Sequence, residues 1–271
     1  MSALNTGVTE TSDTRASPNG GRIGTVTLVG AGPGDPDLIT RKGYAALQAA
    51  DVVFFDDLVS PEIVDILPDR ARCIYVGKPH HRAVITQADI IAQLIAAAKA
   101  GLTVVRLKGG DPMVFGRSAE EIAALQAEHI PVEVVPGVTS ASAAGAAMHV
   151  SLTHRDYASR VTFVTATRRA GALADISGLA GPGRTMVVYM GLCKARDLKD
   201  ALLGEGIDQN WPVAVVEHAS RPSERVIVTT VSDLPDAVVR ENVQSPALFI
   251  VGEVVGTHVT DRVTADAMAL V

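Results

Sequence analysis

The residues with the clearest chemical potential are Gly109, Gly110, Asp111 and Pro112, which directly follow the apolar run of residues 103–107. Two adjacent glycines let the backbone turn at positive φ and leave a bare surface against which a flat ligand can lie. Asp111 adds a carboxylate at the carboxyl end of the expected strand, where open α/β sheets bind their ligands. The stretch could also be a structural turn, but such a turn needs one glycine rather than the whole set. We therefore predict a ligand site at this loop.

A second glycine-rich loop, residues 30–37, follows the first expected strand. Gly30 and Gly32 match the first two glycines of the dinucleotide-binding fingerprint, but Asp35 stands where the third glycine belongs. Pro33 lacks the N–H group that such a turn offers to a pyrophosphate, and the carboxylate of Asp35 would repel one. The sequence also lacks the Gly-Lys-Ser/Thr of a P-loop. These features argue against a phosphate-bearing cofactor.

Carboxylates thus follow three of the expected strands, at Asp35, Asp56 and Asp111. A ligand that fits this pattern tolerates negative charge, carries no phosphate and lies against bare backbone. A cationic nucleoside meets these requirements. S-adenosylmethionine is one, with its sulfonium, ammonium and ribose hydroxyl groups.

Apolar strands alternate with helices along the first half of the chain, which predicts a parallel sheet covered on both faces. Thr86 with Asp89, and Ser118 with Glu121, have the spacing of capping boxes at two helix starts. The expected strands are residues 25–29, 51–55, 72–76, 103–107 and 131–135, and the expected helices are residues 40–50, 86–100, 118–128 and 140–148.

A second strand series follows the polar segment of residues 153–159 and indicates a second domain. We predict an N-terminal α/β domain over residues 22–150 and a C-terminal α/β domain over residues 151–256. Residues 1–21 are expected to form a disordered tail, and residues 257–271 a second tail. The strands of the second series are expected at residues 161–165, 185–189, 213–217, 225–229 and 247–251.

The composition is that of a globular protein with an aliphatic core, because 47% of the residues are hydrophobic and only 4% are aromatic. A formal net charge of −6 without Lys/Arg-rich runs argues against nucleic acid as a partner. Cys73 and Cys193 lack metal-type spacing, so we expect free thiols in a reducing cytosol and no metal. No apolar run reaches the ~18 residues of a membrane span, and no signal peptide is evident, so a cytoplasmic location without membrane contact is expected.

A family resemblance is carried by seven segments, in this order: VGAGPGDPDLIT, DVVFFDDLVS, YVGK, VVRLKGGDPMVFGR, VEVVPGVTSASAA, LTHRDYAS and VVYMGL. In order and spacing they resemble the tetrapyrrole methylases, from about residue 24 to residue 255. The resemblance implies two α/β domains with mainly parallel five-stranded sheets, an S-adenosylmethionine cleft between them, and a homodimer. The combination of DDLVS, GGDPMVFGR and LTHRDYAS is most similar to the branch that methylates uroporphyrinogen III at two pyrrole carbons, giving precorrin-2 and S-adenosylhomocysteine.

The resemblance also implies which residues form the site. An acid and a lysine proposed for proton transfer fall on Asp56 and Lys78. Ser140 departs from the alanine usual in the family. The residues expected to contact S-adenosylmethionine are Pro33, Gly109, Gly110, Asp111, Val114, Thr139, Ser140, Met190, Ala219 and Ala247.

The expected substrate carries eight carboxylates, so an acidic protein must gather cationic residues at the cleft. Arg106, Arg117, Arg155 and His154 are the residues expected to bind it, with Arg160 as a further candidate. For each arginine alone, a structural ion pair is at least as common an explanation. Asp56 could likewise cap the turn that follows it, and Met190 could be an ordinary core residue.

Two other functions remain open at this level. A sister tetrapyrrole methylase acting on a later corrin intermediate would share the cofactor loops, and a non-catalytic nucleotide-binding module would also use glycine loops. Some members of the family carry an added dehydrogenase–chelatase domain. The tails are too short for one, so methylation alone is expected. Whether the product feeds cobalamin or sirohaem synthesis is left open.

Overall fold

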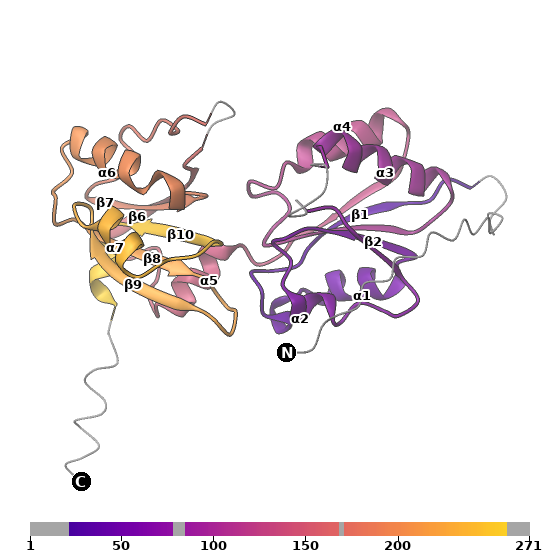
Figure 1. Ribbon diagram of the computed structural model, residues 1–271, viewed down its shortest axis with the longest axis horizontal. Helices are drawn as coiled ribbons and strands as arrows, with labels where there is room; N and C mark the ends of the chain where they lie inside the picture. Colours follow the sequence, from indigo (N-terminus) through magenta and orange to yellow (C-terminus); the bar gives the residue numbers. More distant parts are fainter. Residues whose placement is uncertain (1–21, 78–84, 168–170, 259–271) are drawn as a thin grey trace, which may run out of the picture.

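The computed structural model describes residues 22–77, 85–167 and 171–258. Lys78 and the segments predicted as tails, apart from Thr257 and His258, lie outside the described residues. None of the helices in the described ranges is long and apolar enough to cross a membrane. The chain forms two units, each built on a five-stranded sheet (Figure 1).

The first sheet is parallel throughout and has the strand order β3-β2-β4-β1-β5. Its central strands β1 and β4 are buried along their whole length, as predicted for strands covered on both faces. The bounds are β1 (Val26–Gly30), β2 (Val52–Phe55), β3 (Arg72–Tyr75), β4 (Val104–Lys108) and β5 (Val132–Val135).

Helices cover both faces of this sheet (Figure 1). On one face, α1 (Arg41–Ala49) and α2 (Pro61–Val64) pack against Val29 and Val53 through Leu47 and Ile63. On the other, α3 (Gln87–Lys99) and α4 (Ser118–Ala127) pack against Phe54 through Leu94 and Leu125. A short 3-10 helix, η1 (Pro36–Leu38), precedes α1.

One of the two predicted capping boxes forms. At α3, Asp89 N–H donates to Thr86 Oγ1 at 3.2 Å, and Thr86 N–H donates to Asp89 Oδ2 at 2.8 Å. The box predicted at α4 is wrong, because Arg117 is the capping residue and Ser118 donates to the carbonyl of Pro112. The side chain of Glu121 is buried and pairs with Arg106 and Lys108 instead. Sequence spacing alone does not reveal these tertiary contacts.

The second sheet has the order β6-β7-β10-β8-β9 and is mixed rather than mainly parallel. Only β6 and β7 run parallel, and the other three pairings are antiparallel. The connection of residues 218–224 between β8 and β9 is too short for the crossover that a parallel pairing needs. The bounds are β6 (Ala158–Thr165), β7 (Gly183–Tyr189), β8 (Pro212–Glu217), β9 (Arg225–Thr230) and β10 (Ala247–Val251).

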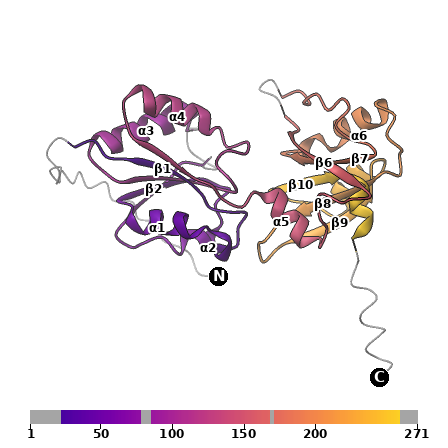
Figure 2. The same ribbon diagram turned by 180° about the vertical axis from the view of Figure 1, so that it is seen from behind.

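On one face of the second sheet, α6 (Ala195–Gly204) and α7 (Leu234–Arg240) pack through Leu198 and Leu234 against Phe249. On the other face lies α5 (Ser140–Ala147), and its buried alanines share a hydrophobic cluster with Val187 and Ile250 (Figure 2). The 3-10 helices η2 (Leu192–Lys194) and η3 (Glu253–Thr257) complete this unit.

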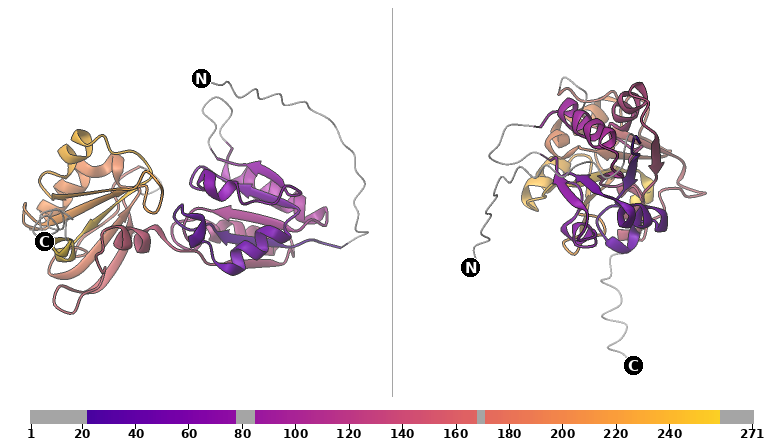
Figure 3. Two further views of the ribbon diagram at one scale, coloured as in Figure 1. Left: turned by 90° about the horizontal axis from the view of Figure 1, so that it is seen from below. Right: turned by 90° about the vertical axis from the view of Figure 1, so that its right-hand side faces the viewer.

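The predicted domain boundary at residue 150 groups α5 with the first domain, but α5 packs on the second sheet. On this packing we take the first unit as residues 22–135 and the second as residues 140–258. Residues 136–139 pass between the units, which lie side by side along the long axis of the molecule (Figure 3).

Candidate active site at the junction of the two units

Three loops of the first unit meet backbone against backbone at the carboxyl edge of its sheet. Gly110 N–H donates to the carbonyl of Gly32 at 2.7 Å, and Gly32 N–H donates back at 3.2 Å. A Cβ on Gly137 would lie 2.4 Å from the carbonyl oxygen of Gly110, and Gly110 has φ 68°. The loops after β1, β4 and β5 therefore need glycine in order to contact one another. From the sequence we assigned Gly110 to a ligand surface and did not predict these contacts between loops.

Asp111 fastens the β4 loop to the β5 loop. Its Oδ1 accepts the N–H of Met113 at 2.8 Å, and its Oδ2 accepts the N–H of Gly137 at 3.0 Å. Val114 follows in the same turn, with its N–H donating to the carbonyl of Asp111 at 3.2 Å. Both oxygens of this predicted cofactor ligand thus organise the loop that would hold the cofactor.

Asp56 lies where β2 ends, and its carboxylate is held from two sides. Oδ2 pairs with Nη2 of Arg106 at 2.5 Å, and Oδ1 accepts the N–H of Leu58 at 3.1 Å. The turn-capping role considered for Asp56 is therefore present, together with an ion pair. Arg106 is only 3% exposed and also donates to the carbonyl of Leu107 at 2.8 Å. Arg106 is thus a buried partner of Asp56, the structural ion pair that was the alternative explanation, and its role in substrate binding stays a prediction.

Glu121 of α4 is the centre of a buried charge network beneath Asp56. It is 0% exposed and accepts from Lys108 Nζ at 2.9 Å, from Gln87 Nε2 at 3.0 Å and from Arg106 Nε at 3.5 Å. Burial, and then the charge of Arg106, lowers the pKa of Lys108. Two cations and two carboxylates balance one another, which is the condition for burying charges at low cost. The sequence signal for this network is the pair of basic residues inside the apolar strand VVRLK.

Tyr189 at the end of β7 joins the second unit to the first. Its hydroxyl lies 2.7 Å from Thr139 Oγ1 and accepts the N–H of Ala141 at 3.2 Å, at the start of α5. Its ring packs on Phe115 of the β4–α4 loop, with ring centroids 5.0 Å apart. Tyr189 carried no prediction, although it is an aromatic residue at a strand end and lies in the segment VVYMGL.

The predicted cofactor residues of the second unit gather at the same edge. Met190 follows Tyr189 with φ 55° and is 53% exposed, so it is not an ordinary core residue. Ala247 pairs with Glu217 where β10 starts beside the end of β8, and Ala219 follows β8. Because β10 runs antiparallel to β7 and β8, its start lies beside their ends. Across the junction, a Cβ on Gly110 would lie 3.9 Å from the nitrogen of Ser140.

Pro33 in the first loop is buried, and its carbonyl oxygen faces the second unit, where Arg221 Nε lies 3.5 Å from it. The structure thus gathers the expected cofactor residues of the first loop, the Gly109–Asp111 loop, the α5 start and the second sheet around one junction.

The predicted substrate residues are more dispersed. Arg117 is exposed at the α4 start and makes a two-pronged pair with Glu120, at 2.7 and 3.0 Å. His154 lies in a tight turn, exchanging backbone hydrogen bonds with Ala158 at 2.8 and 2.9 Å, and Arg155 is exposed beside it. This turn precedes β6, and the end of β6 pairs with Tyr189. Because the eight residues of β6 rise about 3.3 Å each, the turn and Tyr189 lie at opposite ends of the strands. Within one chain, the structure does not bring His154 and Arg155 to the junction.

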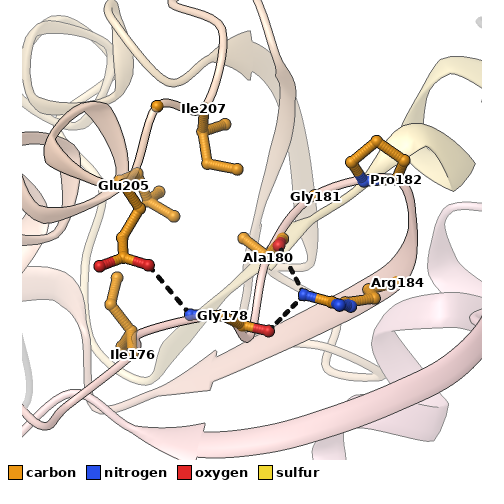
Figure 4. A pocket seen from close by; sticks show the side chains of 10 residues that line it. Ile176, Gly178, Ala180, Gly181, Pro182, Arg184, Glu205 and Ile207 are labelled. Atoms are coloured by element: carbon orange, nitrogen blue, oxygen red, sulfur yellow. Dashed lines mark hydrogen bonds between the residues drawn. The ribbon is translucent and has the colours of Figure 1, made fainter.

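A separate cavity of about 300 Å³ lies in the second unit, near the start of β7 and the end of α6 (Figure 4). Its polar groups bind one another: Glu205 accepts the N–H of Gly178 at 3.1 Å, and Arg184 donates to the carbonyl of Ala180 at 3.4 Å. Because these groups are already paired and Tyr189 is at the other end of β7, the junction remains the candidate active site.

Comparison with known proteins supports the family that the sequence resembles. The family model described as Tetrapyrrole (Corrin/Porphyrin) Methylases matches residues 25–235. A siroheme synthase of Gluconacetobacter diazotrophicus is 46% identical over 234 residues, which cover 86% of this chain and 50% of that protein. A siroheme synthase of Chromobacterium violaceum is likewise 46% identical, over 235 residues. The chain thus spans about half the length of these curated relatives.

Two solved structures share the fold. The uroporphyrin-III C-methyl transferase of Thermus thermophilus, complexed with S-adenosylhomocysteine, is 41% identical with a TM-score of 0.76. The match covers 86% of this chain and 100% of that one. A cobalt precorrin-4 methyltransferase is 30% identical, also with a TM-score of 0.76, over 85% of this chain and 95% of that one.

Proposed function

The chain belongs to the tetrapyrrole (corrin/porphyrin) methylases, and on that premise we propose that it methylates uroporphyrinogen III at C2 and C7. The products are precorrin-2 and two molecules of S-adenosylhomocysteine. The observation that carries the proposal is the 41% identity to a uroporphyrin-III C-methyl transferase over the whole of that chain. A later corrin intermediate is the second candidate, but the cobalt precorrin-4 methyltransferase is only 30% identical.

We propose S-adenosylmethionine as the methyl donor, because the Thermus neighbour is complexed with the corresponding product. The predicted contacts from Pro33 to Ala247 surround one junction, and the bare backbone of Gly110 faces the start of α5. Polar main-chain groups at a helix start, with little side-chain cover, suit ribose and carboxylate groups of a phosphate-free nucleoside.

The donor supplies a methyl group already activated by its sulfonium, so the attacking pyrrole carbon needs no strong base. The chain's residues then have three tasks: to align the reactants, to exclude water and to accept the ring proton. Asp56 is our candidate acceptor, since Arg106 and Leu58 N–H hold its carboxylate in one orientation at the strand end. Lys78 stays a prediction, because it lies outside the described residues.

The substrate's carboxylates are proposed to bind Arg117, whose exposed guanidinium pairs with Glu120. His154 and Arg155 could reach a bound substrate only from another copy of the chain, so their role depends on the predicted homodimer. The siroheme synthases among the relatives are compatible with a sirohaem pathway, and cobalamin synthesis starts from the same product.

The test is an anaerobic incubation of the full chain with S-adenosylmethionine and enzymatically prepared uroporphyrinogen III. We expect a product that carries two added methyl groups, measured by mass spectrometry of its oxidised form. Asp56→Asn is expected to lower kcat by about 10²-fold or more, the usual contribution of a proton-transfer group. Asp57→Asn is the matched control, because Asp57 binds Tyr75 instead of Arg106. Binding of S-adenosylhomocysteine without any methylated product would reject the proposed reaction.

A further inference from the structure

One loop of the second unit, residues 218–224, forms hydrogen bonds with the first unit across the junction. Ser220 Oγ accepts the N–H of Asp35 at 3.1 Å. Arg221 extends further: its Nη2 donates to the carbonyl of Leu58 at 2.8 Å, and its Nε to the carbonyl of Pro33 at 3.5 Å. The two acceptors of Arg221 belong to the loops after β1 and β2, which carry Pro33 and Asp56.

The surroundings of Arg221 are unusual for a surface arginine. Within residues 22–77, 85–167 and 171–258, Arg221 donates its hydrogen bonds to main-chain carbonyls, and no carboxylate forms an ion pair with it. Burial lowers the pKa of the Arg221 guanidinium, while the more distant charge of Glu62 raises it. Removing this charge from water without a carboxylate partner costs free energy, and the contact between the units must offset that cost.

The local backbone is shaped around this contact. A Cβ on Gly34 would lie 2.4 Å from Cγ of Arg221, so the arginine stem lies where any other residue would place its side chain. Ser220 has φ 65° and His218 φ 52°, conformations that side chains other than glycine adopt at a cost of about 1 kcal/mol or more. Such conformations persist where surrounding contacts require them.

We propose that Arg221 is a positioning residue: it clasps the loops bearing Pro33 and Asp56 to the second unit and so completes the cofactor site. The inference rests on the proposed function in that the cofactor lies between the units. Hydrogen bonds from a charged guanidinium are stronger than neutral ones, so Arg221 can order both loops through their carbonyls without an ion pair. Arg106, in contrast, is neutralised inside one unit and cannot link the two.

The experiment compares Arg221→Gln, which removes the charge, with Arg221→Lys, which retains it. Arg196→Gln, at an exposed position on α6, is the matched control. Cys73 and Cys193, the only two cysteines of the chain, are exposed and lie one in each unit, so spin labels on them report the distance between units. Binding of S-adenosylhomocysteine is measured by calorimetry on the same preparations, without label.

We expect a narrow distance distribution in the parent and the control, and a broadened one in Arg221→Gln. S-adenosylhomocysteine affinity should fall about tenfold in Arg221→Gln, as for one lost hydrogen bond to a charged group, with partial recovery in Arg221→Lys. Thermal unfolding should change little, because none of the four hydrophobic clusters of the described residues includes Arg221.

Three outcomes are decisive. Unchanged distances together with unchanged affinity in Arg221→Gln would overturn the clasp. A raised KM for uroporphyrinogen III alone would also overturn it and make Arg221 a ligand of substrate carboxylates instead. If the parent fails to methylate uroporphyrinogen III, the proposed reaction fails, yet the distance and affinity measurements still decide the clasp.

Discussion

The carboxyl edge of the first sheet is held by buried charges and glycine contacts, whereas the facing loops of the second unit are held by a few polar contacts. In the first unit, Glu121 binds two buried cations and Asp111 ties two loops together. In the second unit, Tyr189 is held through its hydroxyl and ring, and Ser220 Oγ accepts the N–H of Asp35 across the junction. From this difference in contacts we expect a rigid region at the first sheet and a more adjustable region in the second unit. Mutations should therefore cost folding stability in the first region and ligand affinity in the second.

The largest effect is expected for Glu121→Leu, which would leave Lys108 and Arg106 buried without their shared carboxylate. Breaking a buried charge network by removing one partner costs about 3–5 kcal/mol of unfolding free energy. Urea unfolding followed by circular dichroism measures this loss. Glu120→Gln on the same helix is the control, and its effect should stay below about 0.5 kcal/mol because its pair with Arg117 is exposed. Equal midpoints for the two variants would remove the basis for a rigid first region.

An intermediate effect is expected for Tyr189→Phe, which keeps the ring contact with Phe115 and removes the hydroxyl. The loss of hydrogen bonds to Thr139 and Ala141 should lower the unfolding free energy by about 1 kcal/mol. Because those residues start α5 beside Gly110, S-adenosylhomocysteine affinity should also fall. Tyr157→Phe, a ring exposed beside His154, is the control and should leave both quantities unchanged. An adjustable second region is contradicted if stability falls while affinity is retained.

The smallest effect on stability is expected for Tyr75, at the end of β3, the outermost strand of the first sheet. A hydrogen bond to Asp57, followed by burial and the charges of Asp57 and Asp56, raises the pKa of Tyr75 to about 12. The folded pKa lies above the ordinary unfolded value of about 10. The stability from this contact is therefore fully present below about pH 10 and is lost as pH rises towards 12. The gain is small because the side chain is 40% exposed to screening solvent.

Ultraviolet titration of the tyrosine phenolates checks this value. The parent has four tyrosines, so one quarter of the absorbance change should occur near pH 12 if only Tyr75 is so delayed. That step should be absent in Tyr75→Phe. A parent curve that is identical in shape to that of the variant after scaling would show that Asp57 does not hold the phenol.

Local patterns in the sequence predicted the elements well. All ten observed strands fall within two or three residues of a predicted one, and the Thr86 capping box is confirmed. The helices α2, α6 and α7 carried no prediction; α2 is short and α7 begins with a proline-containing turn. The strand directions in the second sheet were also missed, because β10 inserts between β7 and β8 from far along the chain.

The features of the candidate site also divide into those that the sequence predicted and those that only the tertiary structure decided. Glycines, carboxylates and apolar strands were enough to locate the loops at the strand ends, and the seven segments that resemble the tetrapyrrole methylases indicated the family. Only the tertiary structure decided what each charged group binds: Arg106 and Glu121 turn inward, Asp111 fastens two loops, and Arg221 crosses between units. Strands, turns and caps depend on neighbours a few residues away, and these the sequence displays. Partners 13 to 188 residues apart meet only after the sheets have formed, so no local pattern encodes them.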